Sequence, residues 1–319
     1  MTNFVLPLEK INKNDVLTAG GKGASLGELN KIVSVPDGFV LPTSTFNTFI
    51  QFNDFEKIIN KEMESIFSKN KKDLEIDIKK INRSSSVLSK LILGGKIPKE
   101  IKDEIFLCFD KYKMEYVAVR SSASMEDGQN DSWAGELESY LNTDRKSLIR
   151  NIKKCWASLF SPRAISYLIE KKISFKNNLV AVVVQKMIQS EVSGIVFTVH
   201  PVNKKKNQML IESCFGLGEL IVGGIVTPDS YIFDKKEKLI LEINVNHQKK
   251  QLIKKGKKNI LVQISNKKRY KQKLSGPQII ELAKLSKKIE KHYKKPQDIE
   301  WAFKNNKFYI VQSRPITTL

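Results

Sequence analysis

Long apolar runs are missing from this sequence of 319 residues. No stretch approaches the roughly 20 apolar residues that a membrane-spanning helix needs. The opening MTNFVLPLEKINK also lacks a basic start followed by a long apolar segment, so we expect neither a signal peptide nor a membrane protein. These absences predict a cytoplasmic protein. Hydrophobic residues at 41% and charged residues at 28% predict that it is globular.

Cysteine is scarce in this chain. The three cysteines, Cys108, Cys155 and Cys214, are far apart in the sequence and show no spacing typical of metal ligands. Each has apolar neighbours, so we interpret the three thiols as small core side chains in a reducing compartment. The sequence therefore predicts neither a disulfide framework nor a cysteine metal site.

Acidic residues are few compared with basic ones, 34 against 55, which gives a formal net charge of +21. Such an excess suggests nucleic acid or another anionic surface as a partner. Much of it lies in four lysine-rich runs, residues 204–206, 249–258, 267–273 and 287–295, in which aromatic residues are rare. Because base stacking needs aromatic rings beside the charge, we interpret these runs as a solvated surface and consider a nucleic-acid partner unlikely.

A glycine-rich turn stands near the N-terminus. Gly20, Gly21, Lys22 and Gly23 precede two leucines and one isoleucine at helical spacing. A glycine turn that leads into a helix N-terminus favours anion binding, and Lys22 adds a positive charge. The glycine spacing matches neither a Walker A loop nor the dinucleotide-binding G-x-G-x-x-G motif. The segment predicts an anion site without assigning it to either motif.

The segment from Val117 to Asn142 holds an arginine that we expect at the end of a strand. Residues 117–119 form a short apolar run that is typical of a buried strand, and Arg120 follows directly. Its guanidinium donates two parallel hydrogen bonds, which suits an oxyanion such as phosphate, and the small residues Ser121 and Gly135 leave room for one. The alternative is a surface hairpin with a salt-bridged arginine.

A second candidate site lies near the C-terminus. Strict alternation places Asp298 and Glu300 on one face of a strand, and Gln312 and Arg314 on a common face of the next. Carboxylate and amide oxygens beside an arginine are typical of magnesium and phosphate binding. Glu300 faces Gln312 only if the connecting loop has an odd number of residues, for instance 305–307. The alternative is a solvent-facing strand whose charges pair among themselves.

Seven segments in order resemble the N-terminal ATP-binding domain shared by phosphoenolpyruvate synthase, pyruvate phosphate dikinase and rifampicin phosphotransferase. They are GGKGASLGEL, VPDGFVLP, VAVRSSASMEDGQNDSWAGELESYLN, CWASLFSPRAISY, VVVQKMIQSEVSGIVFTVHP, IESCFGLGE, and DIEW with IVQSRP. The resemblance implies an α+β, ATP-grasp-like fold. Its N-terminal lobe would comprise residues 1–185 and its C-terminal lobe residues 186–319, with the nucleotide in the cleft between them.

The resemblance also implies roles for individual residues. Those implied to contact ATP are Lys22, Arg120, Gly135, Ser139, Gln185 and Arg314, and those implied to hold Mg²⁺ are Glu300, Gln312 and Asp298. Among them Lys22, Arg120 and Arg314 would bind phosphate and act in catalysis. Gly135 and Ser139 would belong to a loop over the nucleotide, and Gln185 would line the adenine pocket.

The implied function is that of a magnesium-dependent ATP-binding domain or subunit of a dikinase-type phosphotransferase, which splits ATP and transfers its β-phosphate to a histidine. In the family this histidine lies in a swivelling domain, within a threonine-cysteine-histidine motif, and another domain binds the acceptor. His200, His247 and His292 lack that setting. We therefore expect both domains in another chain or in the remainder of a longer one.

The sequence does not determine the phosphate acceptor or exclude two other functions. The acceptor is pyruvate, an antibiotic or another molecule. The alternative functions are a non-catalytic ATP-binding regulatory module and a basic nucleic-acid-binding protein. His200 occupies a position where the family usually has an acidic residue, and we interpret it as a structural substitution.

Overall fold

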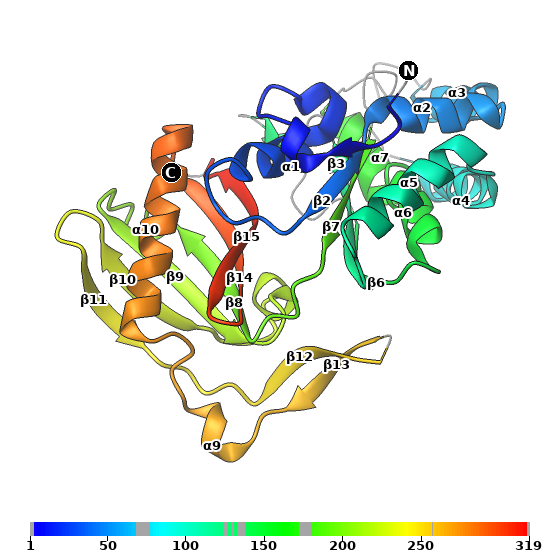
Figure 1. The fold of residues 1–319 in the computed structure, drawn as a ribbon. Helices are drawn as coiled ribbons and strands as arrows, with labels where there is room; N and C mark the ends of the chain where they lie inside the picture. The colour runs from blue at the N-terminus through cyan, green and yellow to red at the C-terminus, as the bar shows by residue number, and fades with distance from the viewer. Residues whose placement is uncertain are drawn as a thin grey trace. The chain divides into compact units, whose positions relative to one another are not determined.

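The structure, a computed structural model, describes residues 3–67, 77–123, 127–128, 131–132, 138–171, 180–256 and 258–317. The chain divides into two compact units. Unit 1 comprises Met1–Ala24 and Asp37–Lys186, and unit 2 comprises Ser25–Pro36 and Met187–Leu319. Each unit combines helices with an antiparallel sheet (Figure 1), which confirms the predicted α+β class. The predicted lobes stay a prediction, since packing defines a compact unit whereas ligand binding defines a lobe.

Unit 1 is built on a five-stranded sheet in the order β1-β2-β7-β3-β6. Its strands are β1 (Leu6–Pro7), β2 (Gly38–Leu41), β3 (Val117–Ala123), β6 (Ser139–Thr143) and β7 (Val180–Lys186), and β4 (Asp127–Gly128) pairs separately with β5 (Asp131–Ser132). Its helices are η1 (Leu8–Lys10), α2 (Thr43–Phe52), α3 (Glu56–Phe67), α4 (Ile78–Gly94), α5 (Lys99–Lys111), α6 (Leu148–Ser158) and α7 (Pro162–Glu170). Helix α1 (Val16–Leu29) begins in unit 1 and ends in unit 2.

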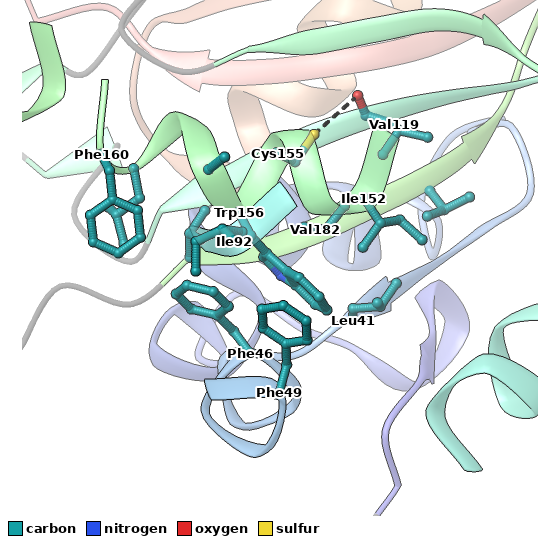
Figure 2. Packing of buried hydrophobic residues seen from close by; sticks show 14 of the residues in the cluster. Leu41, Phe46, Phe49, Ile92, Val119, Ile152, Cys155, Trp156, Phe160 and Val182 are labelled. Atoms are coloured by element: carbon teal, nitrogen blue, oxygen red, sulfur yellow. Dashed lines mark hydrogen bonds between the residues drawn. The ribbon is translucent and has the colours of Figure 1, made fainter. Parts of the chain in front are cut away.

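One face of this sheet forms the main core of unit 1. Side chains that alternate along β3 and β7, such as Val119 and Val182, are fully buried in it. Against them pack the rings of Phe46 and Phe49 from α2 and Trp156 from α6 (Figure 2). The Trp156 ring centroid lies 5.4 Å from that of Phe46 and 4.9 Å from that of Phe49. The helices therefore cover this face of the sheet.

The three cysteines are free thiols, and the interpretation of Cys155 and Cys214 as core residues is confirmed. Both are fully buried, whereas Cys108 is half-buried at the edge of the core. The Cys155 Sγ donates to the carbonyl oxygen of Val119 at 3.6 Å (Figure 2). Burial raises the pKa of Cys155 and that of Cys214 to about 12, so both thiols stay protonated at neutral pH.

Unit 2 is built on a six-stranded sheet in the order β11-β10-β9-β8-β14-β15. Its strands are β8 (Val192–Phe197), β9 (Gln208–Phe215), β10 (Asp229–Asp234), β11 (Leu239–Asn244), β14 (Gln297–Lys304) and β15 (Lys307–Pro315), and β12 (Lys250–Lys255) and β13 (Lys258–Gln263) form a separate ribbon. Its helices are α8 (Glu219–Val222), α9 (Asn266–Arg269) and α10 (Gly276–Tyr293).

Helix α10 covers one face of the six-stranded sheet (Figure 1). It begins at a capping box, in which the backbone N–H of Ser275 donates to Gln278 Oε1 at 2.8 Å, and Pro277 lies in its first turn. The alternation in β14 matches this packing, because Ile299 and Trp301 are fully buried while Asp298 is only half-buried. No helix in the described part of the chain is long and apolar enough to cross a membrane.

Candidate functional site

Arg120 lies in the middle of β3, so the prediction that it ends a strand was wrong. The strand continues to Ala123, and Arg120 pairs with Val183 of β7 on one side and with Ser139 of β6 on the other. Ser121 extends the ladder because its backbone N–H donates to the Glu138 carbonyl at 3.1 Å and its hydroxyl donates to the same oxygen at 3.0 Å. Arg120 is therefore a buried cation, with only 8% of its surface exposed.

Arg120 and Gln185 share the sheet face opposite the main core. Arg120 Nη1 donates to Gln185 Oε1 at 3.4 Å, and Gln185 is only 2% exposed. The Gln185 Nε2 is buried and has no hydrogen-bond partner among the described residues. Leaving a buried donor unpaired costs roughly 1–3 kcal/mol, so a partner from outside the described residues would stabilise this amide. An acceptor atom from a ligand would satisfy this amide.

The glycine turn holds Lys22 against the same strand. Gly20 has a φ of 71° and a ψ of 170°, which divides α1 into two helical segments, and the second begins at the turn as predicted. Lys22 Nζ donates to the Ser121 carbonyl at 3.3 Å, and the backbone N–H of Gly23 donates to Ser122 Oγ at 3.1 Å. The structure therefore places the Lys22 ammonium at the backbone of Ser121, the residue that follows Arg120 in β3. That Lys22 and Arg120 bind an anion stays a prediction.

We expect Gly20→Ala to lower the free energy of unfolding by about 2–5 kcal/mol. The φ and ψ of Gly20 lie in a region that only glycine adopts readily, and an added Cβ would lie 2.2 Å from the Ser122 carbonyl oxygen. Urea denaturation measures the loss. The matched control is Gly224→Ala, because Gly224 has a φ of 63° but open space around its Cβ position. A loss no larger than that of the control would contradict the proposed close packing of the turn.

Ser139 and Gly135 are the remaining residues of the predicted site in unit 1. Ser139 opens β6 directly opposite Arg120 and is exposed, so the structure brings these two together. Gly135 lies outside the described residues. The structure thus groups Lys22, Arg120, Ser139 and Gln185 around β3 and its two neighbouring strands.

In unit 2 the predicted pairing of Glu300 with Gln312 is confirmed, but the strand register that produces it does not come from the loop length. The loop between β14 and β15 contains only Asn305 and Asn306, with φ values of 49° and 57°, so the expected odd loop was wrong. Glu300 pairs with Gln312 whereas Trp301 pairs with Ile310. The extra residue between Ile310 and Gln312 forms a β-bulge, and it restores the register that the two-residue turn alone would not produce.

Asp298 and Arg314 form an ion pair across the same two strands. Arg314 donates to Asp298 Oδ2 from Nε at 2.9 Å and from Nη2 at 2.8 Å. The alternative in which the hairpin charges pair among themselves therefore holds for these two residues. The pair fixes the direction of the guanidinium. Glu300 and Gln312, which lie opposite each other, provide the oxygen atoms that a cation would use.

Glu212 is a candidate site residue that the sequence analysis missed. Ile195 of β8 pairs with Glu300 on one side and with Glu212 of β9 on the other, so both carboxylates lie on one sheet face. Burial, and then the nearby charge of Asp298, raises the pKa of Glu212. The alternation of β9 places Glu212 on one face of its own strand, but only the pairing across three strands aligns it with Glu300.

The pKa shift of Glu212 predicts a pH-dependent effect of Glu212→Gln. A carboxyl group with a raised pKa in the folded protein favours folding when protonated and opposes it once the pH rises above the unfolded value. Glutamine carries no negative charge to bury, so we expect the variant to be more stable than the wild type at neutral pH. Near pH ~3, below the ordinary pKa of glutamate, the difference should vanish. Urea denaturation at both pH values tests this, and a wild type that is the more stable at neutral pH would refute it.

No group of three or more His, Cys, Asp and Glu side chains that could hold a metal ion occurs within the described ranges. A magnesium site does not require one, because Mg²⁺ commonly takes one or two carboxylates and fills its other positions with phosphate oxygens and water. His200 uses one ring nitrogen within its own turn. Its Nδ1 accepts from the backbone N–H groups of Val202 at 3.3 Å and Asn203 at 3.4 Å, which agrees with the interpretation of His200 as structural.

The two units therefore carry complementary chemistry. Unit 1 offers an ammonium, a buried guanidinium and an amide donor with no partner in the described part of the chain. Unit 2 offers carboxylate and amide oxygens beside a second guanidinium. Such groups are typical of a domain that binds a phosphate-bearing ligand together with a divalent cation. The chain belongs to the pyruvate phosphate dikinase AMP/ATP-binding domain family, whose model matches residues 16–319.

Several curated proteins are similar to nearly the whole chain. A probable phosphoenolpyruvate synthase from Archaeoglobus fulgidus is 43% identical over 99% of this chain and 42% of its own length. A probable phosphoenolpyruvate synthase from Methanothermobacter thermautotrophicus is 36% identical over 100% of this chain and 47% of its own length. Rifampicin phosphotransferase from Bacillus subtilis is 34% identical over 100% of this chain and 36% of its own length. The chain thus spans less than half the length of these relatives.

Among solved structures, D-alanine-D-alanine ligase from Helicobacter pylori aligns with 67% of this chain and 53% of its own. The TM-score is 0.27 and the identity 15%, a likeness too distant to bear on function.

Proposed function

We propose that this chain binds ATP with Mg²⁺ and acts as the ATP-binding part of a dikinase-type phosphotransferase. Family membership and the names of the relatives, phosphoenolpyruvate synthase and rifampicin phosphotransferase, support the proposal. The observation that carries it is the buried Gln185 amide, whose Nε2 has no partner among the described residues and whose Oε1 accepts from Arg120. A nucleotide supplies both an acceptor for the amide and an anion for the guanidinium.

The unit 1 residues would hold the nucleotide itself. Arg120 and Lys22 would donate to phosphate oxygens, since a buried guanidinium on β3 and an ammonium that reaches the same strand from α1 would form a cationic cradle. Gln185 would donate to the adenine base. Ser139, opposite Arg120, and Gly135 would belong to the segment that covers the nucleotide.

The unit 2 residues would serve the metal and the outer phosphates. Glu300 and Gln312 would hold Mg²⁺ through their side-chain oxygens, and Asp298 would direct Arg314 toward phosphate while lying close to the metal. When bound, Mg²⁺ neutralises charge that develops on the phosphate oxygens. Phosphoryl transfer depends mainly on positioning and on charge stabilisation, so these residues need no covalent role.

We further propose that a histidine in another domain or chain attacks the β-phosphorus of ATP and releases AMP. Water then removes the γ-phosphate as inorganic phosphate, which leaves the β-phosphate on the histidine. That histidine would lie in a swivelling domain, and a further domain would bind the acceptor. The test incubates the protein with Mg²⁺, ATP labelled at the β-phosphate, and a histidine domain excised from one of the relatives. We expect AMP and an acid-labile label on the partner, both of which require this chain.

Calorimetry with Mg²⁺ and ATP separates the possible failures. Binding without AMP and without label under any pairing would overturn the transfer step and favour a regulatory ATP-binding module. Absence of binding would overturn the proposal as a whole. A variant with Glu300→Gln serves as the control in the transfer assay, because it should bind the partner but lack a metal ligand.

A further inference from the structure

A basic arm extends from the six-stranded sheet of unit 2. We use this name for residues 245–275, of which the structure describes 245–256 and 258–275. The described part contains β12, β13 and α9 and projects away from the sheet (Figure 1). The arm holds eleven lysines and arginines and no aspartate or glutamate. Six of its lysines are exposed and pair with no carboxylate among the described residues: Lys249, Lys250, Lys255, Lys258, Lys267 and Lys271. This surface is positive without compensation from the arm itself.

The base of the arm is firmly attached to the sheet. Lys273 is fully buried, and its Nζ lies 2.6 Å from Asp229 Oδ1 of β10. The side chain of Gln248 accepts from the backbone N–H of Phe215 at 2.8 Å and donates to the Phe215 carbonyl at 3.1 Å, in the manner of a paired strand. Because these contacts hold the base of the arm in place in the free protein, binding of a ligand would carry a smaller entropic cost of ordering.

An aromatic stack lies at the same base. The rings of His247 and Tyr270 are parallel to within 7°, with their centroids 4.3 Å apart, although 23 positions separate them in the sequence. Tyr270 remains 69% exposed, so His247 covers only part of its ring. Burial, followed by the positive charges of Lys249 and Arg269, lowers the pKa of His247, which keeps its ring neutral at pH 7. The stack thus combines an open aromatic face with surrounding positive charge.

We propose that the basic arm binds single-stranded nucleic acid, with phosphates along its lysines and a base stacked on the open face of Tyr270. Grooves that bind single strands combine positive charge with exposed aromatic rings. Lysine outnumbers arginine in the arm by ten to one, which favours backbone contact over the reading of bases. The binding should therefore depend little on base sequence. This inference goes beyond the proposed phosphotransferase function and does not depend on it. It revises the expectation that a nucleic-acid partner is unlikely, because the stack of His247 and Tyr270 supplies an aromatic face beside the charge.

The charge of the arm is tested with the full chain and a fluorescent single-stranded RNA of mixed sequence, about 20 nucleotides long so that it exceeds the usual site size. Anisotropy is measured between about 50 and 200 mM salt. We expect the double variant Lys255→Glu, Lys258→Glu to weaken binding by about tenfold or more. The slope of log K against log salt concentration should become smaller by roughly 1.4, because two phosphate contacts on a single strand are lost. The control, Lys205→Glu with Lys206→Glu, changes the net charge equally in an exposed loop of unit 2. Equal losses in both variants would overturn the assignment to the arm.

The stacking contact is tested separately at Tyr270. We expect Tyr270→Ala to weaken RNA binding by about tenfold, and Tyr270→Phe to bind as the wild type does, because phenylalanine retains the ring. An RNA duplex of the same sequence should bind more weakly than the single strand, since its bases are not available for stacking. Polyglutamate that displaces the RNA, and that binds the Tyr270→Ala variant as tightly as the wild type, would indicate an acidic protein partner and overturn the proposal. Unchanged thermal unfolding of each variant shows that its fold is intact.

Discussion

Arg120→Met is expected to weaken ATP binding by roughly 30-fold to 5,000-fold, which corresponds to about 2–5 kcal/mol for removing one member of a buried charge contact. Arg120 is 8% exposed in the middle of β3, and its guanidinium donates to Gln185. The guanidinium would donate to phosphate through its fork of N–H groups, and methionine has no donor to replace them. Calorimetry with Mg²⁺ and ATP measures the loss.

The fold should survive this substitution, because exchanging a buried charge for an apolar side chain of similar volume is often neutral or stabilising. Arg120→Lys should fall between the wild type and the methionine variant, since lysine keeps the charge but not the planar fork. Arg145→Met is the matched control, because Arg145 is an exposed arginine of the same unit that pairs with Asp110. Equal ATP affinities of the Arg120→Met protein and the wild type would refute the phosphate role.

Glu300→Gln is expected to raise the half-saturating concentration of Mg²⁺ by at least about tenfold, since losing even an outer contact of a metal ligand often costs 10- to 100-fold. Glutamine keeps the shape of the side chain but removes the negative charge that attracts the cation. Gln312 lies opposite in the hairpin and would remain as an oxygen donor, so binding should weaken without being abolished. A magnesium titration of ATP binding provides the measurement.

The matched control for this prediction is Glu242→Gln. Glu242 is an exposed glutamate on the edge strand β11 of the same sheet, and its carboxylate accepts from Asn244 at 2.8 Å. We expect no change in the magnesium dependence of the control. ATP binding in the absence of Mg²⁺ should be similar in the Glu300→Gln protein and the wild type. A magnesium curve unchanged by Glu300→Gln would show that the metal is held elsewhere.

Much of unit 1 could be predicted from local sequence alone. The apolar run before Gln185 forms β7, and the glycine turn at Lys22 opens a helical segment, because both patterns are satisfied within a few neighbouring residues. The end of β3 was predicted wrongly. The apolar run ends before Arg120, yet Ser121 continues the ladder through bonds to Glu138, a partner that no local pattern identifies.

The hairpin of unit 2 shows a similar division. The alternation of Asp298 and Glu300 predicts their common face, and the amide and arginine on the next strand predict the chemistry. The sequence does not reveal that a bulge at Val311, and not the loop length, brings Glu300 opposite Gln312. Bulges depend on how both strands pack, so they rarely leave a signal in the residues themselves.

The sequence alone determined the class of the fold and the strands that hold Arg120, Glu300 and Gln312, because periodicity and motif order are properties of neighbouring residues. Only the tertiary structure decided which side chains meet. It buried Arg120 beside Gln185, aligned Glu212 with Glu300 across three strands, and stacked His247 on Tyr270 within the basic arm. These contacts join residues far apart in sequence, and strand register and side-chain packing alone determine such distances.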